Sequence, residues 1–182
     1  MTFATTAVRR GFTSFAVLAL VSAVMLGVAC NKTANANYKD SVKASLEQAD
    51  LKDVTVSEDA AKNTITLGGN VHSEDAKARA GSVAQSSAGP RIIANEISVE
   101  PVGNEGQARK IESNLDDGIE SNYKAVLISK GLDKQHIRYN AKNGVLTLKG
   151  SVRNPTLRQE AQELAKNTPN VEQVVNEIQV ER

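Results

Sequence analysis

Hydrophobic and polar positions along this chain follow two periods, and the same succession of periods occurs twice. Val42, Leu46 and Ala49 have the spacing of one helical face, whereas Ile65 and Leu67 alternate with polar residues as in a half-buried strand. The second helix of each copy carries an apolar stripe that suits packing on a sheet. The complete pattern of each copy predicts helix, strand, strand, helix and strand, in that order.

The two copies are related by a constant offset of 81 residues. Residues 63–71 align with residues 144–152, and residues 95–100 align with residues 176–181, without a gap. A register kept this long indicates two copies of one small folded unit. The sequence therefore predicts an α+β fold of two tandem αββαβ domains, each a three-stranded mixed sheet packed on two helices. The duplicated positions are core and turn residues, which favours a binding or structural module over an enzyme.

Capping and turn residues mark the ends of several elements. Ser73 and the pair Asn154-Pro155 are expected to begin the second helix of each copy, because they suit the N-cap and the first helical position. Asn143-Gly144 predicts a hairpin turn in the second copy. The first helix of the second copy is expected to extend over residues 106–131, and Gly118 marks a point where it could break into two helices.

The chain divides into five segments. Residues 1–29 are expected to form an export signal, and residues 30–37 a cysteine followed by a polar tether. The first domain is expected at residues 38–101. A glycine-containing linker at residues 102–106 separates it from the second domain at residues 107–182, which has the extended first helix.

The N-terminal residues indicate export and a membrane anchor. Arg9-Arg10 precedes an uncharged run at residues 11–29, which is typical of an export signal. The residues up to Cys30 resemble a bacterial lipoprotein box, in which the cysteine is lipidated and becomes the first residue. Two alternatives stay open: signal cleavage after Ala36, which releases a soluble protein, and an uncleaved run of 19 residues that spans the bilayer. Cys30 is the only cysteine, so no internal disulfide can form.

Charge argues against nucleic acid as a partner. After Cys30 the chain has 20 basic and 21 acidic residues, so the mature protein is close to neutral. Such a chain lacks the basic field that draws in nucleic acid by counterion release. Charges of both signs are mixed along both copies, as on a solvated surface.

Candidate chemistry is sparse. His72 lies beside Ser73 and two acids, but neighbours in sequence at a helix start do not make a catalytic triad, and helix capping explains them better. His136 has no second histidine or cysteine nearby, so a metal site is not expected. The pair Asp116-Asp117 is expected to be solvated. We therefore predict no catalytic residues, no metal site, no cofactor and no small-molecule substrate.

Residues 148–152 and 170–178, with their copies at 67–71 and 95–97, resemble the BON domain family of small bacterial envelope domains. Gly69 and Gly150 stand at the family's glycine position, where a side chain is expected to obstruct the strand-to-helix turn. The resemblance implies binding of membrane phospholipid or of envelope proteins, and a role in envelope integrity or stress protection.

Two such domains behind a lipoprotein box resemble the dual-BON outer-membrane lipoproteins, which implies a lipid anchor in the periplasm, with the outer membrane favoured. The membrane-facing element implied by the resemblance is the first helix of the second copy. Its basic residues are Arg109, Lys110, Lys124 and Lys130. Its acidic residues, which weaken a site for anionic lipid, are Glu112, Asp116, Asp117 and Glu120.

Two other functions stay open. The first is a soluble periplasmic stress chaperone, like the osmotically induced dual-BON proteins. The second is a structural subunit of an envelope complex that pairs with a partner through an exposed outer strand.

Overall fold

The computed structural model describes residues 37–181, which belong to one compact unit. The expected export signal, the lipidation site Cys30 and the alternative cleavage site Ala36 lie outside the described residues.

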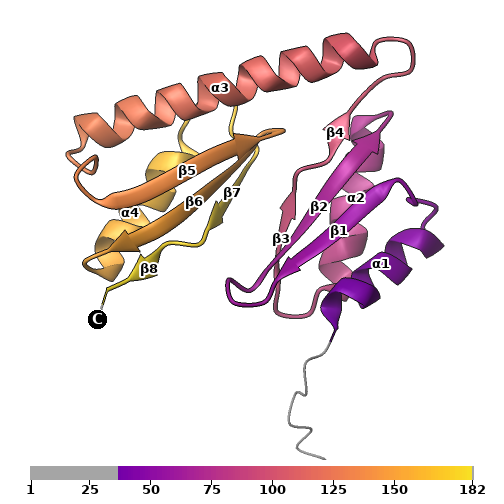
Figure 1. Ribbon diagram of the computed structural model, residues 1–182, viewed down its shortest axis with the longest axis horizontal. Coiled ribbons are helices and arrows are strands. Elements are labelled where there is room, and N and C mark those ends of the chain that lie inside the picture. The colour runs from indigo at the N-terminus through magenta and orange to yellow at the C-terminus, as the bar shows by residue number, and fades with distance from the viewer. Residues whose placement is uncertain (1–36, 182) are drawn as a thin grey trace, which may run out of the picture. The chain divides into compact units, whose positions relative to one another are not determined.

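The first domain has six elements, drawn in indigo to rose in Figure 1. They are α1 (Tyr38–Gln48), β1 (Val54–Asp59), β2 (Thr64–Val71), α2 (Glu74–Ser87), β3 (Ile92–Asn95) and β4 (Ser98–Val99). Strand β1 pairs antiparallel with β2, and β3 and β4 both pair parallel with β2.

The second domain repeats this topology. Its elements are α3 (Glu105–Ser129), β5 (His136–Lys142), β6 (Val145–Val152), α4 (Pro155–Lys166), β7 (Gln173–Asn176) and β8 (Gln179–Val180). The predicted α+β fold and its mixed sheets are confirmed, with one difference. The last strand of each copy is split in two, and Ile97 or Ile178, which lies between the two pieces, is buried in the core.

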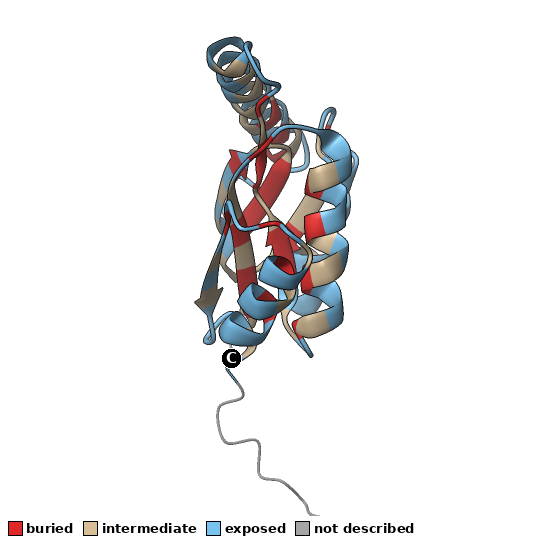
Figure 2. Ribbon diagram, turned by 90° about the vertical axis from the view of Figure 1, so that its right-hand side faces the viewer, coloured by how far each residue is buried: buried red, intermediate tan, exposed pale blue. Residues whose placement is uncertain are grey.

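The two cores are built at equivalent positions. In the order of the offset, the first domain buries Val42, Leu46, Ile65, Leu67, Ala80, Ala84 and Ile97, and the second buries Tyr123, Leu127, Leu146, Leu148, Ala161, Ala165 and Ile178. Figure 2 shows these buried residues on the strands and on the inner faces of the helices, whereas the outer helix faces are exposed. The periodicity that predicted the repeat is therefore the periodicity of burial.

Caps and turns form as the residue types predict. The Ser73 side chain accepts a hydrogen bond from the Ala76 N–H at 3.2 Å, and the Asn154 side chain accepts one from the Leu157 N–H at 2.9 Å. Asn143 and Gly144 have φ of 49° and 82°. Two successive positive φ values are what a two-residue hairpin turn matching the twist of its strands requires.

Gly69 and Gly150 lie within β2 and β6, not in the turn between strand and helix where the sequence predicted an obstruction. Their φ values are +94° and +108°. A Cβ atom on Gly69 would lie 2.3 Å from the Asp53 carbonyl oxygen, and one on Gly150 would lie 1.8 Å from that of His136. The neighbouring strand therefore imposes the requirement for glycine.

Helix α3 is continuous, so the break considered at Gly118 does not occur. A single glycine costs a helix about 1 kcal/mol, which packing on both sides of it outweighs. The half after Gly118 packs into the second core through Ile119, Tyr123 and Leu127. The half before Gly118 contacts the first domain, where Glu112 accepts a hydrogen bond from Val99.

Contacts between the edge strands β3 and β7 also join the two domains. The Gln173 side chain accepts a hydrogen bond from the Asn95 N–H at 3.1 Å and donates one to the Ile93 carbonyl, so it engages the pairing groups of β3. The Lys77 ammonium donates to the Asn143 carbonyl at 3.0 Å. A small buried apolar cluster is formed by Ala94 of β3, Val145 of β6 and Val175 of β7. Part of the edge of β3 is thus already engaged by this chain.

Candidate functional site

The acidic residues of α3 are turned toward the backbone of neighbouring strands. Glu112, Asp116 and Glu120 are spaced four residues apart and so lie on one side of the helix. Glu112 accepts from the Val99 N–H at 2.9 Å, and Glu120 accepts from the Ala141 N–H at 2.8 Å. These carboxylates satisfy backbone donors that would otherwise lack a partner.

Asp116 does the same at the hairpin turn between β5 and β6. Its two carboxylate oxygens accept from the N–H groups of Asn143 and Gly144, at 2.8 and 3.1 Å. The prediction that the pair Asp116-Asp117 is solvated is therefore wrong for Asp116, whereas Asp117 is exposed. Sequence spacing could not separate the two, because the turn they lie near is more than twenty residues away.

The basic residues proposed for partner contact fall into two groups. Arg109 forms an ion pair with the nearly buried Glu100 at 2.9 Å, so it helps to join α3 to the first domain. Lys110, Lys124 and Lys130 are exposed and take part in no ion pair among residues 37–181.

The apolar side chain of Ile128, 56% exposed, lies one helical turn beyond Lys124. We give the name α3 outer face to the exposed residues Lys110, Lys124 and Ile128 of the helix together with Lys130, the exposed residue at its C-cap.

The neighbourhood of His72 is not catalytic in form. His72 Nδ1 lies 3.0 Å from the Glu100 carbonyl oxygen, and Ser73 caps α2. Nearby, a groove of about 460 Å³ runs under α3. Its apolar lining includes Val99, Ile111 and Leu115, the last two of which are 51% and 46% exposed.

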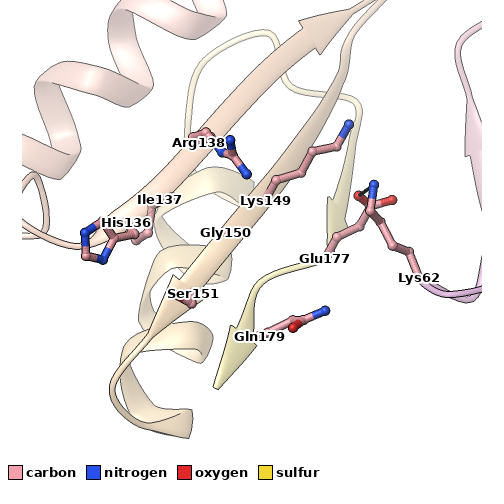
Figure 3. Close-up of a pocket in the computed structure, with 9 residues that line it drawn as sticks. All are labelled: Lys62, His136, Ile137, Arg138, Lys149, Gly150, Ser151, Glu177 and Gln179. Carbon is pink, nitrogen blue, oxygen red and sulfur yellow. Dashed lines mark ion pairs between the residues drawn. The ribbon is translucent and has the colours of Figure 1, made fainter. Parts of the chain in front are cut away.

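A second hollow, of about 610 Å³, lies on the outer face of the second sheet (Figure 3). Its lining residues are Lys62, His136, Ile137, Arg138, Lys149, Gly150, Ser151, Glu177 and Gln179. Arg138 and Lys149 are direct partners across β5 and β6. This site was not predicted from the sequence, although the alternation of β5 places His136 and Arg138 on the same face of the strand.

Perturbed ionisation follows from burial and from local hydrogen bonds. Burial is the main cause of the raised pKa of the Tyr123 phenol, and the nearby Tyr139 adds to it. Burial is also the main cause of the raised pKa of the Tyr139 phenol, and the charge of Glu120 adds to it. A hydrogen bond to Asp59, followed by the charge of Glu177, raises the pKa of the Lys62 ammonium. All three shifts raise pKa values that already lie above neutral pH, so at neutral pH the phenols stay neutral and Lys62 stays charged.

The described part of the chain has neither a cluster of metal-binding side chains nor a helix suited to crossing a membrane. Residues 37–181 contain no group of three or more His, Cys, Asp or Glu side chains placed to hold a metal ion. None of the described helices combines the length and the apolar character needed to cross a bilayer.

Comparison with protein families gives two matches to the BON domain, at residues 34–101 and 115–182. The comparison with curated proteins gave no match. The part of α3 before residue 115 lies outside both matches. BON domains are associated with phospholipid-binding envelope proteins and are generally non-catalytic. The two matches span most of the chain, which therefore belongs to the BON domain family and carries two copies of the domain.

Proposed function

We propose that this protein is a non-catalytic component of the cell envelope that binds anionic phospholipid surfaces through the α3 outer face. The observation that carries the proposal is which charged side chains of α3 are engaged within the protein and which are exposed. The carboxylates of Glu112, Asp116 and Glu120 accept hydrogen bonds from backbone N–H groups. Lys110, Lys124 and Lys130 are exposed, and Ile128 adds exposed apolar surface one turn beyond Lys124.

The expected affinity of this face is modest. Each lysine near an anionic membrane surface contributes about 1 kcal/mol, and Asp117 on the same side of α3 opposes them. Ile128 adds a small apolar contact with the interface. Such a surface suits a protein that is already tethered, because a tether converts the second contact into an intramolecular one with a high effective concentration.

The tether that we propose is a lipid on Cys30, in a periplasmic protein with the outer membrane as the favoured site. The basic start and apolar run before Cys30 support this proposal. The test is the intact mass of the protein from a native membrane fraction, beside a Cys30→Ala variant. A chain that starts at Cys30 with added acyl groups is the expected result. A plain polypeptide that starts at Asn37 in the soluble fraction would contradict the anchor.

Lipid contact by α3 is tested with a local probe, because the apolar run of the full chain enters any bilayer. We would label Ile128→Cys with an environment-sensitive fluorophore in the full chain carrying Cys30→Ala. A blue shift is expected with vesicles that contain phosphatidylglycerol and not with phosphatidylcholine alone. High salt is expected to reduce it, because the attraction is electrostatic.

The decisive variant replaces Lys110, Lys124 and Lys130 with glutamine. This variant should need about a hundredfold more lipid to give the same blue shift, because each of the three lysines contributes about 1 kcal/mol to membrane binding. The matched control carries glutamine at three exposed lysines of the first domain, Lys39, Lys43 and Lys52. Equal responses from the two triple variants would overturn the assignment to α3.

A second candidate function, a soluble stress chaperone, is favoured by the apolar groove under α3. Ile111 and Leu115 offer exposed apolar surface there. We would measure suppression of aggregation of a denatured client by the full chain and by its Ile111→Ser/Leu115→Ser variant. Activity lost in this variant and kept in the lysine variant would favour the chaperone.

A further inference from the structure

We propose that the second domain has a separate binding site for a phosphate group in the hollow of Figure 3, with Arg138 and Lys149 as its principal ligands. The site is built on β5 and β6 and shares no residue with the α3 outer face. This site can therefore be tested independently of the proposed membrane contact.

The first argument is an uncompensated pair of like charges. Arg138 and Lys149 are directly opposite each other in the antiparallel ladder, so their side chains leave the same face of the sheet. Like charges at such positions destabilise a sheet. No carboxylate among residues 37–181 forms an ion pair with either side chain. A bound anion would relieve this repulsion.

The surrounding charges leave the hollow cationic. Its lining has three basic side chains, Lys62, Arg138 and Lys149, against one carboxylate, Glu177. Glu177 Oε2 lies 3.4 Å from the Lys62 ammonium, and Figure 3 shows these two side chains reaching toward each other, away from Arg138. Outside the lining, Glu181 accepts a hydrogen bond from Ser151. Neither acid forms an ion pair with Arg138 or Lys149.

The second argument comes from the other copy of the domain. Where the second domain has Arg138 opposite Lys149, the first domain has Thr55 opposite Gly68 at the same place in its sheet. The place of His136, whose carbonyl oxygen faces Gly150, is taken in the first domain by Asp53, whose carbonyl oxygen faces Gly69. Since the first domain forms the same sheet without any cation at these three places, the fold does not require them. Their presence in the second domain calls for a ligand rather than a packing role.

The residue types indicate phosphate. The planar guanidinium of an arginine can donate two parallel hydrogen bonds to a phosphate, and a lysine adds a mobile point charge. Gly150 next to Lys149 presents no side chain, and Gln179 supplies a further amide donor at the rim. The hollow is large enough for a phosphate ester, carried either by a soluble molecule or by a lipid headgroup.

The test is calorimetric titration of the full chain in a neutral detergent with inorganic phosphate and with glycerol phosphate. Ionic strength is held constant with chloride. Saturable binding is expected, and Arg138→Ser/Lys149→Gln should weaken it by about tenfold or more, because charge-assisted hydrogen bonds are lost. The matched control Lys43→Gln/Lys52→Gln removes the same charge from exposed positions of the first domain and should bind as the parent does.

Vesicles of phosphatidylglycerol distinguish the two sources of the phosphate, when they are used without detergent and beside vesicles of phosphatidylcholine that control for insertion of the apolar run. If the Arg138/Lys149 variant loses affinity for soluble esters, the site takes free phosphate compounds. If it loses affinity only for vesicles, the site takes a lipid headgroup. Binding of every probe that is unchanged in the variant, or no saturable binding at all, would overturn the site. The lysine variant of the α3 outer face should leave binding of soluble phosphate unchanged.

Discussion

The first and second domains bury side chains at the same positions but present different residues on the outer faces of their sheets. Where the first domain has Thr55 paired with Gly68, the second has Arg138 paired with Lys149. The second domain also has an extended first helix, α3, which contacts the first. The shared part accounts for the fold, so the places where the copies differ are where function is to be sought.

The largest effect expected concerns what the copies share. Gly150→Ala would bring a Cβ atom within 1.8 Å of the His136 carbonyl oxygen, at a φ of +108° that alanine rarely adopts. We expect a loss of about 3 kcal/mol or more in unfolding free energy, because clash and backbone strain add. Gly69→Ala should act in the same direction in the first domain, where the distance is 2.3 Å.

The measurement for both glycine variants is urea unfolding. Gly106→Ala is the control, because no atom within 4 Å meets its added Cβ and its helical position favours alanine. If Gly150→Ala unfolds at the same urea concentration as the parent, the glycine position is not a requirement of the fold.

The next effect concerns the one core position where the copies differ most in size. Tyr123 of the second core corresponds to Val42 of the first, and it packs edge-on against Tyr139 with ring centroids 5.1 Å apart. Tyr123→Val should lower the unfolding free energy by about 3 kcal/mol, because it leaves a cavity. Tyr123→Phe removes only the hydrogen bond to the Ala161 carbonyl and should cost about 1 kcal/mol.

Thermal unfolding of the full chain measures both substitutions. Equal losses from Tyr123→Val and Tyr123→Phe would mean that the hydroxyl, and not ring volume, is what the second core needs.

A smaller effect separates two neighbouring aspartates of α3. Asp116→Ala leaves the N–H groups of Asn143 and Gly144 without their acceptor and should cost about 1–3 kcal/mol. Asp117→Ala removes an exposed carboxylate and should change stability by less than about 0.5 kcal/mol. The check is urea unfolding of the two variants side by side. Equal losses would contradict the assignment of the acidic side of α3 to backbone capping.

The same pair shows what could be predicted from the sequence. Alternation, helical stripes, caps and turns depend on local spacing, so the repeat, the fold and the N-caps at Ser73 and Asn154 were predicted correctly. The role of Asp116 depends on a turn that the fold brings beside α3, and the extent of α3 depends on packing that outweighs Gly118. Neither the role of Asp116 nor the extent of α3 can be predicted from local sequence patterns.

The hollow between β5 and β6 was missed for a related reason. Arg138 and Lys149 are eleven residues apart in the sequence, and only the register of the hairpin makes them partners. Once Asn143-Gly144 had been identified as its turn, that register could have been worked out. The lysines of α3 were found because a family resemblance drew attention to the helix, but the direction in which its acids point required the structure.

Alkaline pH should distinguish the two cores. Burial raises the pKa of Tyr123 far above the ordinary value of 10.0, and the first core has no tyrosine at the equivalent position, Val42. The neutral phenol is favoured in the folded state, so its contribution is complete below pH 10 and is lost as pH rises from there toward the folded-state pKa. The loss approaches about 1.4 kcal/mol for each pH unit.

Urea unfolding at pH 9 and pH 11 measures this loss, with Tyr123→Phe as the matched control. The variant should lose less stability than the parent between these two pH values. An identical loss in both proteins would mean that other groups account for the alkaline sensitivity.

The smallest expected change in unfolding free energy concerns the outer faces of the two sheets. Without a bound anion, Arg138→Ser removes the repulsion from Lys149 and leaves a small hydroxyl side chain where the first domain has Thr55. We expect a gain of about 0.2–1 kcal/mol in unfolding free energy in a phosphate-free buffer of low salt. Saturating phosphate should reverse the order, because it binds the folded parent and stabilises it by mass action. A substitution that is neutral or destabilising in both buffers would mean that the cationic pair carries no unrelieved repulsion, and the difference between the two sheet faces would then be one of solubility alone.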